Sequence, residues 1–305
     1  MHESVLLNES IESLNLKEDS IIVDCTLGYG GHSSEILKRI PKGFLYSFDQ
    51  DIDAINYSKE RLSKVGSNFL IIKSNFKNIK EELKKRNVDK VDGILYDLGV
   101  SSPQLDQGDR GFSFHQNARL DMRMDKDAKL DAYEVVNTYS VSDLTRIFKD
   151  YGEEKFASSI AKKIGDVRKE KTIETTLELV DIIKSSVPFK YQREHHPARK
   201  VFQAIRIEVN HELEVFEKSL RDGLTMLNKD GRICVITFHS LEDKICKDIY
   251  NEVSKLDDAV KGLPIIPDSY LKDFKVIKTF KPKTEELEKN NRSRSSKLRV
   301  IEKIR

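Results

Sequence analysis

Residues 21–40 have the sequence IIVDCTLGYGGHSSEILKRI, which combines an apolar run, three glycines and a helical pattern. A strand, a glycine turn and a helix in this order let the backbone approach a nucleotide-like ligand at the carboxyl end of the strand. We expect the helix to begin with Ser33 or Ser34 as its N-cap. The dinucleotide fingerprint G-x-G-x-x-G would need a third glycine where the chain has Ser33. The turn therefore predicts a nucleoside site without the usual dinucleotide motif.

Short apolar runs rich in β-branched and aromatic residues alternate with helical segments in the first hundred residues. The runs are SIIVDCT, GFLYSFD, NFLIIKS and VDGILYDLG. This alternation predicts βαβ units on a mostly parallel sheet, with one of the connecting helices over residues 51–65. The fold class expected is therefore α/β.

The alternation stops after YDLGV, and the next convincing strand is GRICVITFHS near Gly231. The interval has the pattern of helices, including a long one from about Pro197 to Leu227. We therefore predict a sheet domain formed by residues 1–104 and 210–305, and an inserted helical domain over residues 105–209.

The chain beyond Gly231 is expected to complete the sheet. A helix over residues 241–253 is followed by FKVIKTFKP and KLRVIEKI, which have the pattern of two paired strands. The segment between these strands, KTEELEKNNRSRSS, is predicted to be a polar loop.

Composition limits the classes of function. The chain has 305 residues, 38% of them hydrophobic, and 53 basic residues against 51 acidic ones, so a polyanion would need a local basic patch. Cys25, Cys234 and Cys246 form no CxxC pair and are expected to be buried, reduced thiols. No apolar run approaches the roughly 18 residues of a membrane span, and no signal peptide is recognisable. These features predict a cytoplasmic protein without membrane association.

Acidic and aromatic side chains stand at successive strand ends. Asp24 ends the first run and Asp49 the second, where a carboxylate can accept hydrogen bonds from both ribose hydroxyls of an adenosine. Phe76 follows the third run, where it can cover an adenine, and Asp97 closes the fourth. Taken singly, Asp49 could cap a helix, Asp24 could orient the glycine turn and Phe76 could belong to the core. Together they favour a nucleoside site.

A series of motifs resembles one known family over almost the whole chain. The motifs are, in order, DCTLGYGGHS, FDQD, YDLGVSSPQLD, RGFSF, LDMRMD, FQAIRIEVNHEL, FHSLED and NRSRSSKLRV. They are similar to those of the bacterial small-subunit ribosomal RNA cytosine-4-amino methyltransferases, the MraW family. The resemblance implies a class I S-adenosylmethionine-dependent methyltransferase fold with an inserted all-helical domain.

The resemblance also implies a cofactor, a reaction and a partner. The cofactor is S-adenosyl-L-methionine, and the reaction methylates the 4-amino group of a cytosine in the decoding centre of 16S ribosomal RNA. The RNA would be bound within the small ribosomal subunit, by a monomer or a homodimer of this chain. The implied cofactor contacts are Gly30, Gly31, His32, Asp49, Phe76, Asp97 and Gln104.

Methyl transfer to an amine needs positioning and hydrogen-bond acceptors rather than a metal. Asp97 supplies a carboxylate at the end of the fourth strand. Methylation at cytosine carbon 5 is disfavoured because it needs a thiolate, and no cysteine stands in the turn directly after the fourth or fifth strand. His239 ends the fifth strand and is either a base contact or a structural residue, whereas Ser240 is expected to form a capping box with Asp243. Asp97 and His239 are the candidate catalytic residues.

Two basic patches are candidate RNA contacts, because an extruded base has to be held through its flanking phosphates. They lie in KYQREHHPARKVFQAIR and NNRSRSSKLR, and the residues favoured are Arg199, Lys200, Arg292, Arg294 and Lys297. Three alternatives stay open at this stage: a methyltransferase for DNA or protein amines, a nicotinamide-dependent oxidoreductase, and an RNA-binding protein without catalytic activity.

Overall fold

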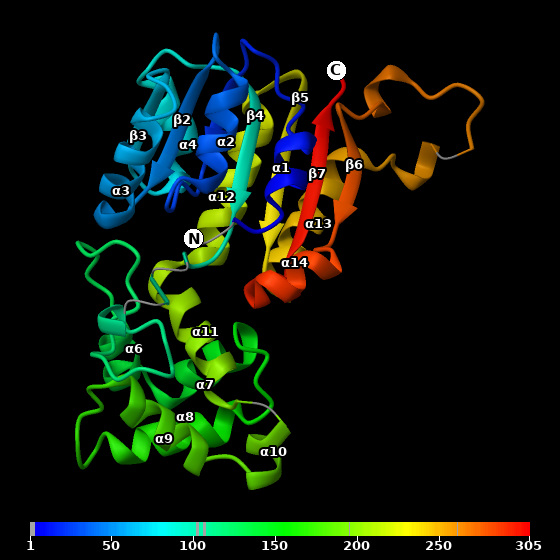
Figure 1. The fold of residues 1–305 in the computed structure, drawn as a ribbon. Helices are drawn as coiled ribbons and strands as arrows, with labels where there is room; N and C mark the ends of the chain where they lie inside the picture. The colour runs from blue at the N-terminus through cyan, green and yellow to red at the C-terminus, as the bar shows by residue number, and fades with distance from the viewer. Residues whose placement is uncertain (1–3, 102–103, 106–107, 195, 261) are drawn as a thin grey trace. The chain divides into compact units, whose positions relative to one another are not determined.

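The computed structural model describes residues 4–101, 104–105, 108–194, 196–260 and 262–305, without the side chains of Glu194, Asn291 and Arg292. The chain divides into two compact units (Figure 1). The sheet unit comprises Met1–Gly99 and Leu213–Arg305, and the helical unit comprises Val100–Glu212. The sequence placed the insertion at 105–209, a few residues inside these limits.

Seven strands of the described chain form one sheet in the order β3-β2-β1-β4-β5-β7-β6. β1 to β5 are parallel, and β7 is antiparallel to both of its neighbours. The α/β sheet with a helical insertion that the resemblance implies is therefore confirmed. The strands are β1 (Ile21–Asp24), β2 (Phe44–Asp49), β3 (Phe69–Lys73), β4 (Val91–Asp97), β5 (Leu227–Thr237), β6 (Phe274–Phe280) and β7 (Lys297–Lys303).

Helices cover both faces of the sheet because the strands alternate apolar side chains between two cores. Ile22 of β1 packs in one core with α1, α2 and α3, whereas Val23 packs in the other with α4, α12 and α13. The helices of this unit are α1 (Leu7–Ser13), α2 (Gly31–Arg39), α3 (Ile52–Ser63), α4 (Ile79–Lys84), α12 (Glu212–Met226), α13 (Ser240–Ser254) and α14 (Thr284–Lys289), with short 3₁₀ turns η1 (Phe76–Asn78), η3 (Asp258–Val260), η4 (Asp268–Tyr270) and η5 (Asn291–Ser295). The three cysteines are buried and free, as expected.

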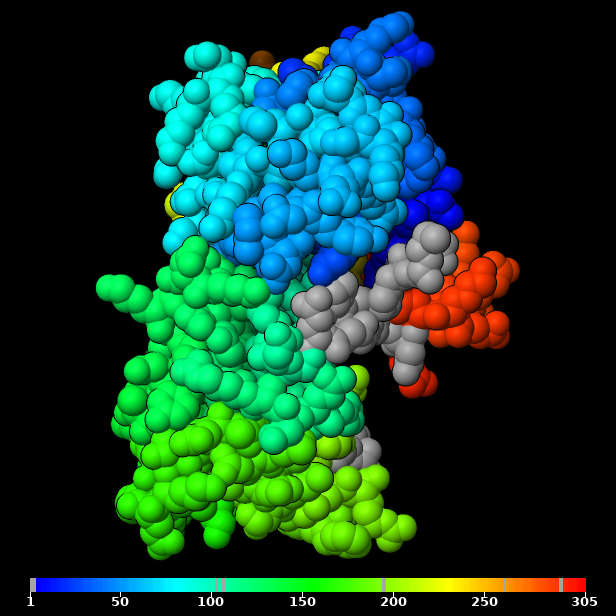
Figure 2. All heavy atoms as spheres, turned by 60° about the vertical axis from the view of Figure 1, so that its left-hand side comes forward, coloured from blue at the N-terminus to red at the C-terminus, as the bar shows by residue number. Residues whose placement is uncertain are grey.

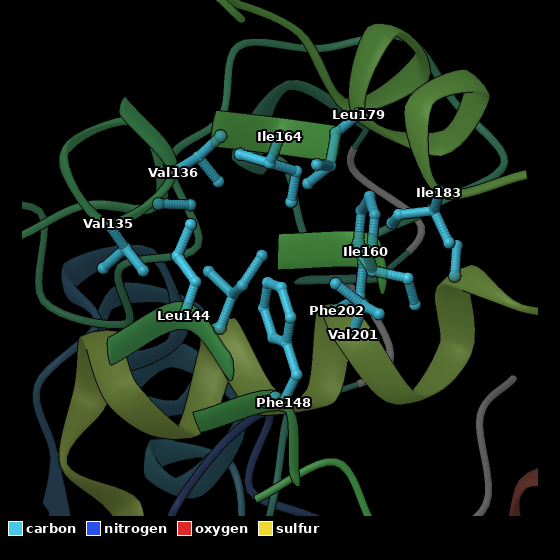
Figure 3. Close-up of a cluster of buried hydrophobic side chains, with 14 of the residues drawn as sticks. Val135, Val136, Leu144, Phe148, Ile160, Ile164, Leu179, Ile183, Val201 and Phe202 are labelled. Carbon is cyan, nitrogen blue, oxygen red and sulfur yellow. The ribbon is translucent and has the colours of Figure 1, made fainter. Parts of the chain in front are cut away.

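The helical unit has an apolar core of its own, drawn in Figure 3. Phe148, Ile160 and Leu179, from three different helices, are fully buried in it. Figure 2 shows this unit as spheres, in green. Its elements are η2 (Gly108–Arg110), α6 (Ala132–Thr138), α7 (Val141–Asp150), α8 (Ala157–Val167), α9 (Thr176–Ser185), α10 (Phe189–Glu194) and α11 (Ala198–Asn210).

The prediction of a single helix from Pro197 to Leu227 is wrong. The chain forms α11 and α12 with a break at His211, whose φ of 51° is left-handed. Asn210 stabilises the break, because its side chain accepts a hydrogen bond from the N–H of Met124 at 2.8 Å and donates one to the carbonyl of Met122 at 2.8 Å. The break falls at the boundary between the two units.

Two smaller expectations also need correction. α2 begins at Gly31 with Gly30 as its N-cap, rather than at Ser33 or Ser34. Both serines are buried inside the first turn, where Ser34 donates to the carbonyl of Gly30 at 2.6 Å. The segment expected to be a polar loop contains the helix α14 and the turn η5.

Among the described residues, no helix is both long and apolar enough to cross a bilayer.

Candidate methyl-donor site

The glycine turn after β1 is held by hydrogen bonds to its backbone. Gly28 and Gly30 have φ of 49° and 72°, values that glycine adopts at little cost. Ser58 of α3 donates to the carbonyl of Gly28 at 2.7 Å, and Arg61 donates to that of Tyr29 at 3.0 Å. The turn is therefore a fixed backbone surface at the carboxyl end of β1.

Asp24 orients this turn. Its carboxylate is buried and accepts hydrogen bonds from the N–H of Thr26 at 3.0 Å and from the hydroxyl of Ser33 at 2.7 Å. Burial raises the pKa of Asp24 above its ordinary value, and these bonds oppose the shift. Both carboxylate oxygens are used within the protein, so the structure supports the orienting role considered for Asp24. Ser33, which stands where the dinucleotide motif has its third glycine, thus donates one of the hydrogen bonds that hold Asp24.

Asp49 presents its carboxylate at the end of β2 with acceptor capacity to spare. One oxygen accepts the N–H of Gly28 at 2.9 Å and the other accepts the N–H of Asp51 at 2.9 Å. The backbone of Gln50 is a further donor to this carboxylate, and the acceptor position that remains is available for a hydroxyl. Burial is the main cause that raises the pKa of Asp49 to about 6. The N-cap of α3 is Asp51, so the helix-capping alternative belongs to that residue and not to Asp49.

Asp97 and His32 face each other at the next strand end. The Nδ1 atom of His32 lies 3.6 Å from Oδ2 of Asp97, while Oδ1 of Asp97 and Nε2 of His32 are buried without a hydrogen-bond partner among the described residues. Burial, reinforced by the charges of Asp24 and Glu242, raises the pKa of Asp97 to about 8. Burial lowers the pKa of His32 to about 4. Polar atoms left in this state are typical of a ligand site.

The segment before α1 contributes to the site, which sequence analysis missed. The imidazole of His32 donates a hydrogen bond to the backbone carbonyl of Val5, and a Cβ at Gly31 would collide with the hydroxyl of Ser4. Leu6 has a left-handed φ of 49°, and its N–H donates to the Glu286 carboxylate at 2.9 Å. No sequence motif marks this contact, because it joins residues 280 positions apart.

Phe76 lies in η1 at the end of β3, where it is partly buried and packs edge-on against Tyr96, with ring centroids 5.8 Å apart. The structure thus brings six of the implied cofactor contacts to the carboxyl ends of β1 to β4 or to the segments that directly follow these strands: Gly30, Gly31, His32, Asp49, Phe76 and Asp97. Gln104 belongs to the helical unit, where its side-chain oxygen accepts the N–H of Ser101 at 3.0 Å.

His239 caps α13. Its Nδ1 accepts the N–H of Glu242 at 3.5 Å, and its Nε2 lies 3.0 Å from the Glu242 carboxylate. The same carboxylate accepts the N–H of Phe238 at 2.8 Å. The capping box is therefore formed by His239 and Glu242, and the one expected from Ser240 and Asp243 is wrong. Both ring nitrogens face Glu242, which favours the structural reading of His239 over a catalytic one.

The candidate RNA-binding residues differ in whether their side chains already form hydrogen bonds or ion pairs within the protein. Arg199 and Arg294 are exposed. Lys200 donates to the carbonyl of Glu153 at 2.7 Å, and Lys297 pairs with Asp243 at 2.7 Å. The side chain of Arg292 lies outside the described residues.

Comparisons with known proteins agree with this arrangement. A model of the MraW methylase family matches residues 1–304. The chain is 53% identical over 308 residues to the ribosomal RNA small subunit methyltransferase H of Exiguobacterium sibiricum, and the match covers 100% of this chain and 98% of that protein.

Two solved structures resemble the chain more distantly. A putative rRNA methylase from Clostridium thermocellum matches with a TM-score of 0.47 at 13% identity, and a putative methyltransferase from Streptococcus mutans in complex with SAH matches with a TM-score of 0.46 at 14% identity. Both matches cover 100% of each chain, but at this distance they carry no argument about this molecule. The family rests instead on the full-length model and on the close relative: the chain belongs to the MraW methylase family.

Proposed function

We propose that the chain transfers a methyl group from S-adenosylmethionine to the 4-amino group of a cytosine in the decoding centre of 16S ribosomal RNA. The close relative is named as a methyltransferase of small-subunit ribosomal RNA. The observation that carries the proposal is the partly buried carboxylate of Asp97, whose Oδ1 is buried and unpartnered among the described residues, beside a glycine turn and a ribose-type acid. We also propose that the RNA is bound within the small ribosomal subunit, which places the activity in the cytoplasm.

The polar groups of the site fit S-adenosylmethionine. Asp49 is fixed by backbone donors and keeps acceptor capacity for a ribose hydroxyl. Gly30 and Gly31 place backbone without side chains next to His32. Phe76 supplies an apolar ring for an adenine. The unpartnered oxygen of Asp97 suits a cationic neighbour, whose charge would return the pKa of this carboxyl toward its ordinary value.

When bound, the cofactor supplies an electrophilic methyl group on a sulfonium. The protein has to hold the amine nitrogen in line at near-attack distance and exclude water. The lone pair of a cytosine amine is delocalised into the ring, and an acceptor that bonds its hydrogens localises that pair on nitrogen. Asp97 in its ionised form is such an acceptor. It can also take the proton that the amine loses once the new bond has formed.

The decisive experiment is transfer of labelled methyl groups to small ribosomal subunits and to protein-free rRNA, both from cells that lack this enzyme. Label recovered as 4-methylcytidine would establish the cofactor, the reaction and the substrate class together. Label in DNA or protein substrates, but not in RNA, would replace the proposal by the amine-methyltransferase alternative. Tight binding of NADH in place of S-adenosylmethionine would favour the oxidoreductase.

A further inference from the structure

Three aromatic rings form a contiguous group within the helical unit, before α11 and in the loop that follows η2. The centroid of Phe114 lies 4.4 Å from that of His115 and 4.6 Å from that of His196, and the two histidine rings are 5.4 Å apart. Phe114 and His196 are inclined by 30° to each other. We call these residues, Phe114, His115 and His196, the ring cluster.

The ring cluster is anchored on its inner side and open on its outer side. Phe114 packs edge-on against Phe202 of α11, which is 3% exposed and belongs to the core. His196 immediately precedes Pro197, the N-cap of α11, so its backbone is fixed by the helix. His115 is exposed, and Phe114 and His196 are partly exposed. A ring held by a core in this way loses little conformational entropy when a planar ligand stacks on it.

The surroundings of the cluster are positively charged. Burial lowers the pKa of His196, and the charges of His115, Lys184 and Arg199 lower it further. Arg199 is exposed on the first turn of α11. The Nδ1 atom of His196 is buried and has no hydrogen-bond partner among the described residues. A ligand suited to this place has a planar aromatic face, a negative charge and a polar group that can bond to an imidazole.

An unpaired nucleotide has these three properties. Its base stacks on aromatic side chains, its phosphates pair with lysine and arginine, and its base edge and ribose hydroxyls offer hydrogen bonds. We propose that the ring cluster is a stacking site for an unpaired base of ribosomal RNA, with Lys184 and Arg199 positioned for the flanking phosphates. The inference rests on the proposed function and gives the helical unit a defined part in it, namely to hold a nucleotide of the same RNA.

The experiment measures the binding of the full-length protein to a short single-stranded RNA oligonucleotide that carries one 2-aminopurine, a base whose fluorescence is quenched by stacking. His115→Ala should weaken binding roughly tenfold and reduce the quenching, because a base–aromatic stack is lost. His115→Phe keeps an aromatic face and should stay within about twofold of the parent protein. Arg199→Ala should lower the salt dependence of binding while the quenching at saturation remains.

Lys162→Ala removes an exposed charge from α8 of the same unit and is the matched control for Arg199→Ala. If His115→Ala and His115→Phe weaken binding equally, or if neither changes the quenching, the stacking site is refuted. Far-ultraviolet circular dichroism of each variant excludes unfolding as the cause.

Failure of this inference and failure of the proposed function give different results. Loss of stacking in the parent protein, with normal formation of 4-methylcytidine, would refute the stacking site alone. Quenching that depends on His115, in a protein that forms no 4-methylcytidine, would refute the proposed reaction and leave an RNA-binding protein.

Discussion

The two units differ in how they bury their acids. At the strand ends of the sheet unit, Asp49, Asp97 and His32 have pKa values shifted by burial, and two of their polar atoms are without partners among the described residues. The helical unit has an apolar core, and its buried acids are paired: the Glu154 carboxylate accepts the hydroxyl of Tyr191 at 2.8 Å, and Asp131 caps α6. At the strand ends of the sheet unit an acid thus keeps one buried oxygen unpaired within the described chain, whereas the buried acids of the helical unit are paired.

The largest effect is expected from a substitution that creates a cavity in the core of the helical unit, and it tests whether the two units act separately. Ile160→Ala removes a fully buried side chain of α8 and should destabilise that unit by about 2–5 kcal/mol. Affinity for S-adenosylmethionine, which we assign chiefly to the sheet unit, should change little. Denaturant unfolding and calorimetric titration measure the two quantities. Val141→Ala, at a residue 39% exposed, should change stability by less than about 0.5 kcal/mol. A parallel loss of cofactor affinity in Ile160→Ala would show that the two units do not act separately.

Asp49→Ala should have the next largest effect, this time on the cofactor. The change removes the proposed ribose acceptor and leaves the N–H groups of Gly28 and Asp51 without their carboxylate. Affinity for S-adenosylmethionine should fall by about 1.5–3 kcal/mol, or roughly 10–150-fold. Calorimetric titration measures it. Asp53→Ala, at an exposed acid in the first turn of α3, is the control and should bind normally. Normal binding by Asp49→Ala would remove this residue from the site.

The pKa of Asp97 makes a prediction about stability and pH. The folded protein holds this proton more tightly than the unfolded chain, because the pKa rises from 3.8 to about 8. The free energy of unfolding of the ligand-free protein should therefore fall as pH increases between these two values. Asp97→Asn should flatten this fall in urea titrations made at several pH values, whereas Asp53→Asn should not. An unchanged slope in Asp97→Asn would mean that this carboxyl ionises normally.

The smallest effect expected is on RNA binding through single cations. Arg294 is exposed, so Arg294→Ala should reduce the salt slope of RNA binding by about 0.7 and leave cofactor affinity alone. Lys297 is already paired with Asp243, so Lys297→Ala should reduce the slope less. Filter binding at a series of salt concentrations distinguishes the two. Equal slopes for both variants would show that the ion pair with Asp243 opens on RNA binding.

Much of the sheet unit could be predicted from local pattern. The four apolar runs, the acids that end β2 and β4, and the pairing of β6 with β7 follow from periodicity and from strand-end chemistry, whereas the antiparallel direction of that pair is seen only in the structure. The three cysteines were correctly expected to be buried. These features depend on side chains close together in the sequence, or on the regular geometry of a parallel sheet.

The wrong predictions concern places where hydrogen bonds from distant residues set the backbone conformation. The break at His211 depends on Asn210 bonding to residues 122 and 124, and an apolar periodicity that continues across it gives no warning. The start of α2 was displaced because Ser33 bonds to Asp24 instead of capping the helix. The contact between Leu6 and Glu286 joins residues 280 positions apart. Sequence patterns locate regular elements, and such long-range bonds adjust where they begin and end.

The position of β7 has a consequence for how the protein is made. Of the described strands it is the last to be synthesised, yet it lies inside the sheet, between β5 and β6. β6 pairs with no other described strand, so it leaves the ribosome before its only partner exists. The helical unit is continuous in sequence and is complete long before that. During translation the insertion can therefore fold early, whereas β5 stays an unpaired edge of the sheet until β7 has been synthesised.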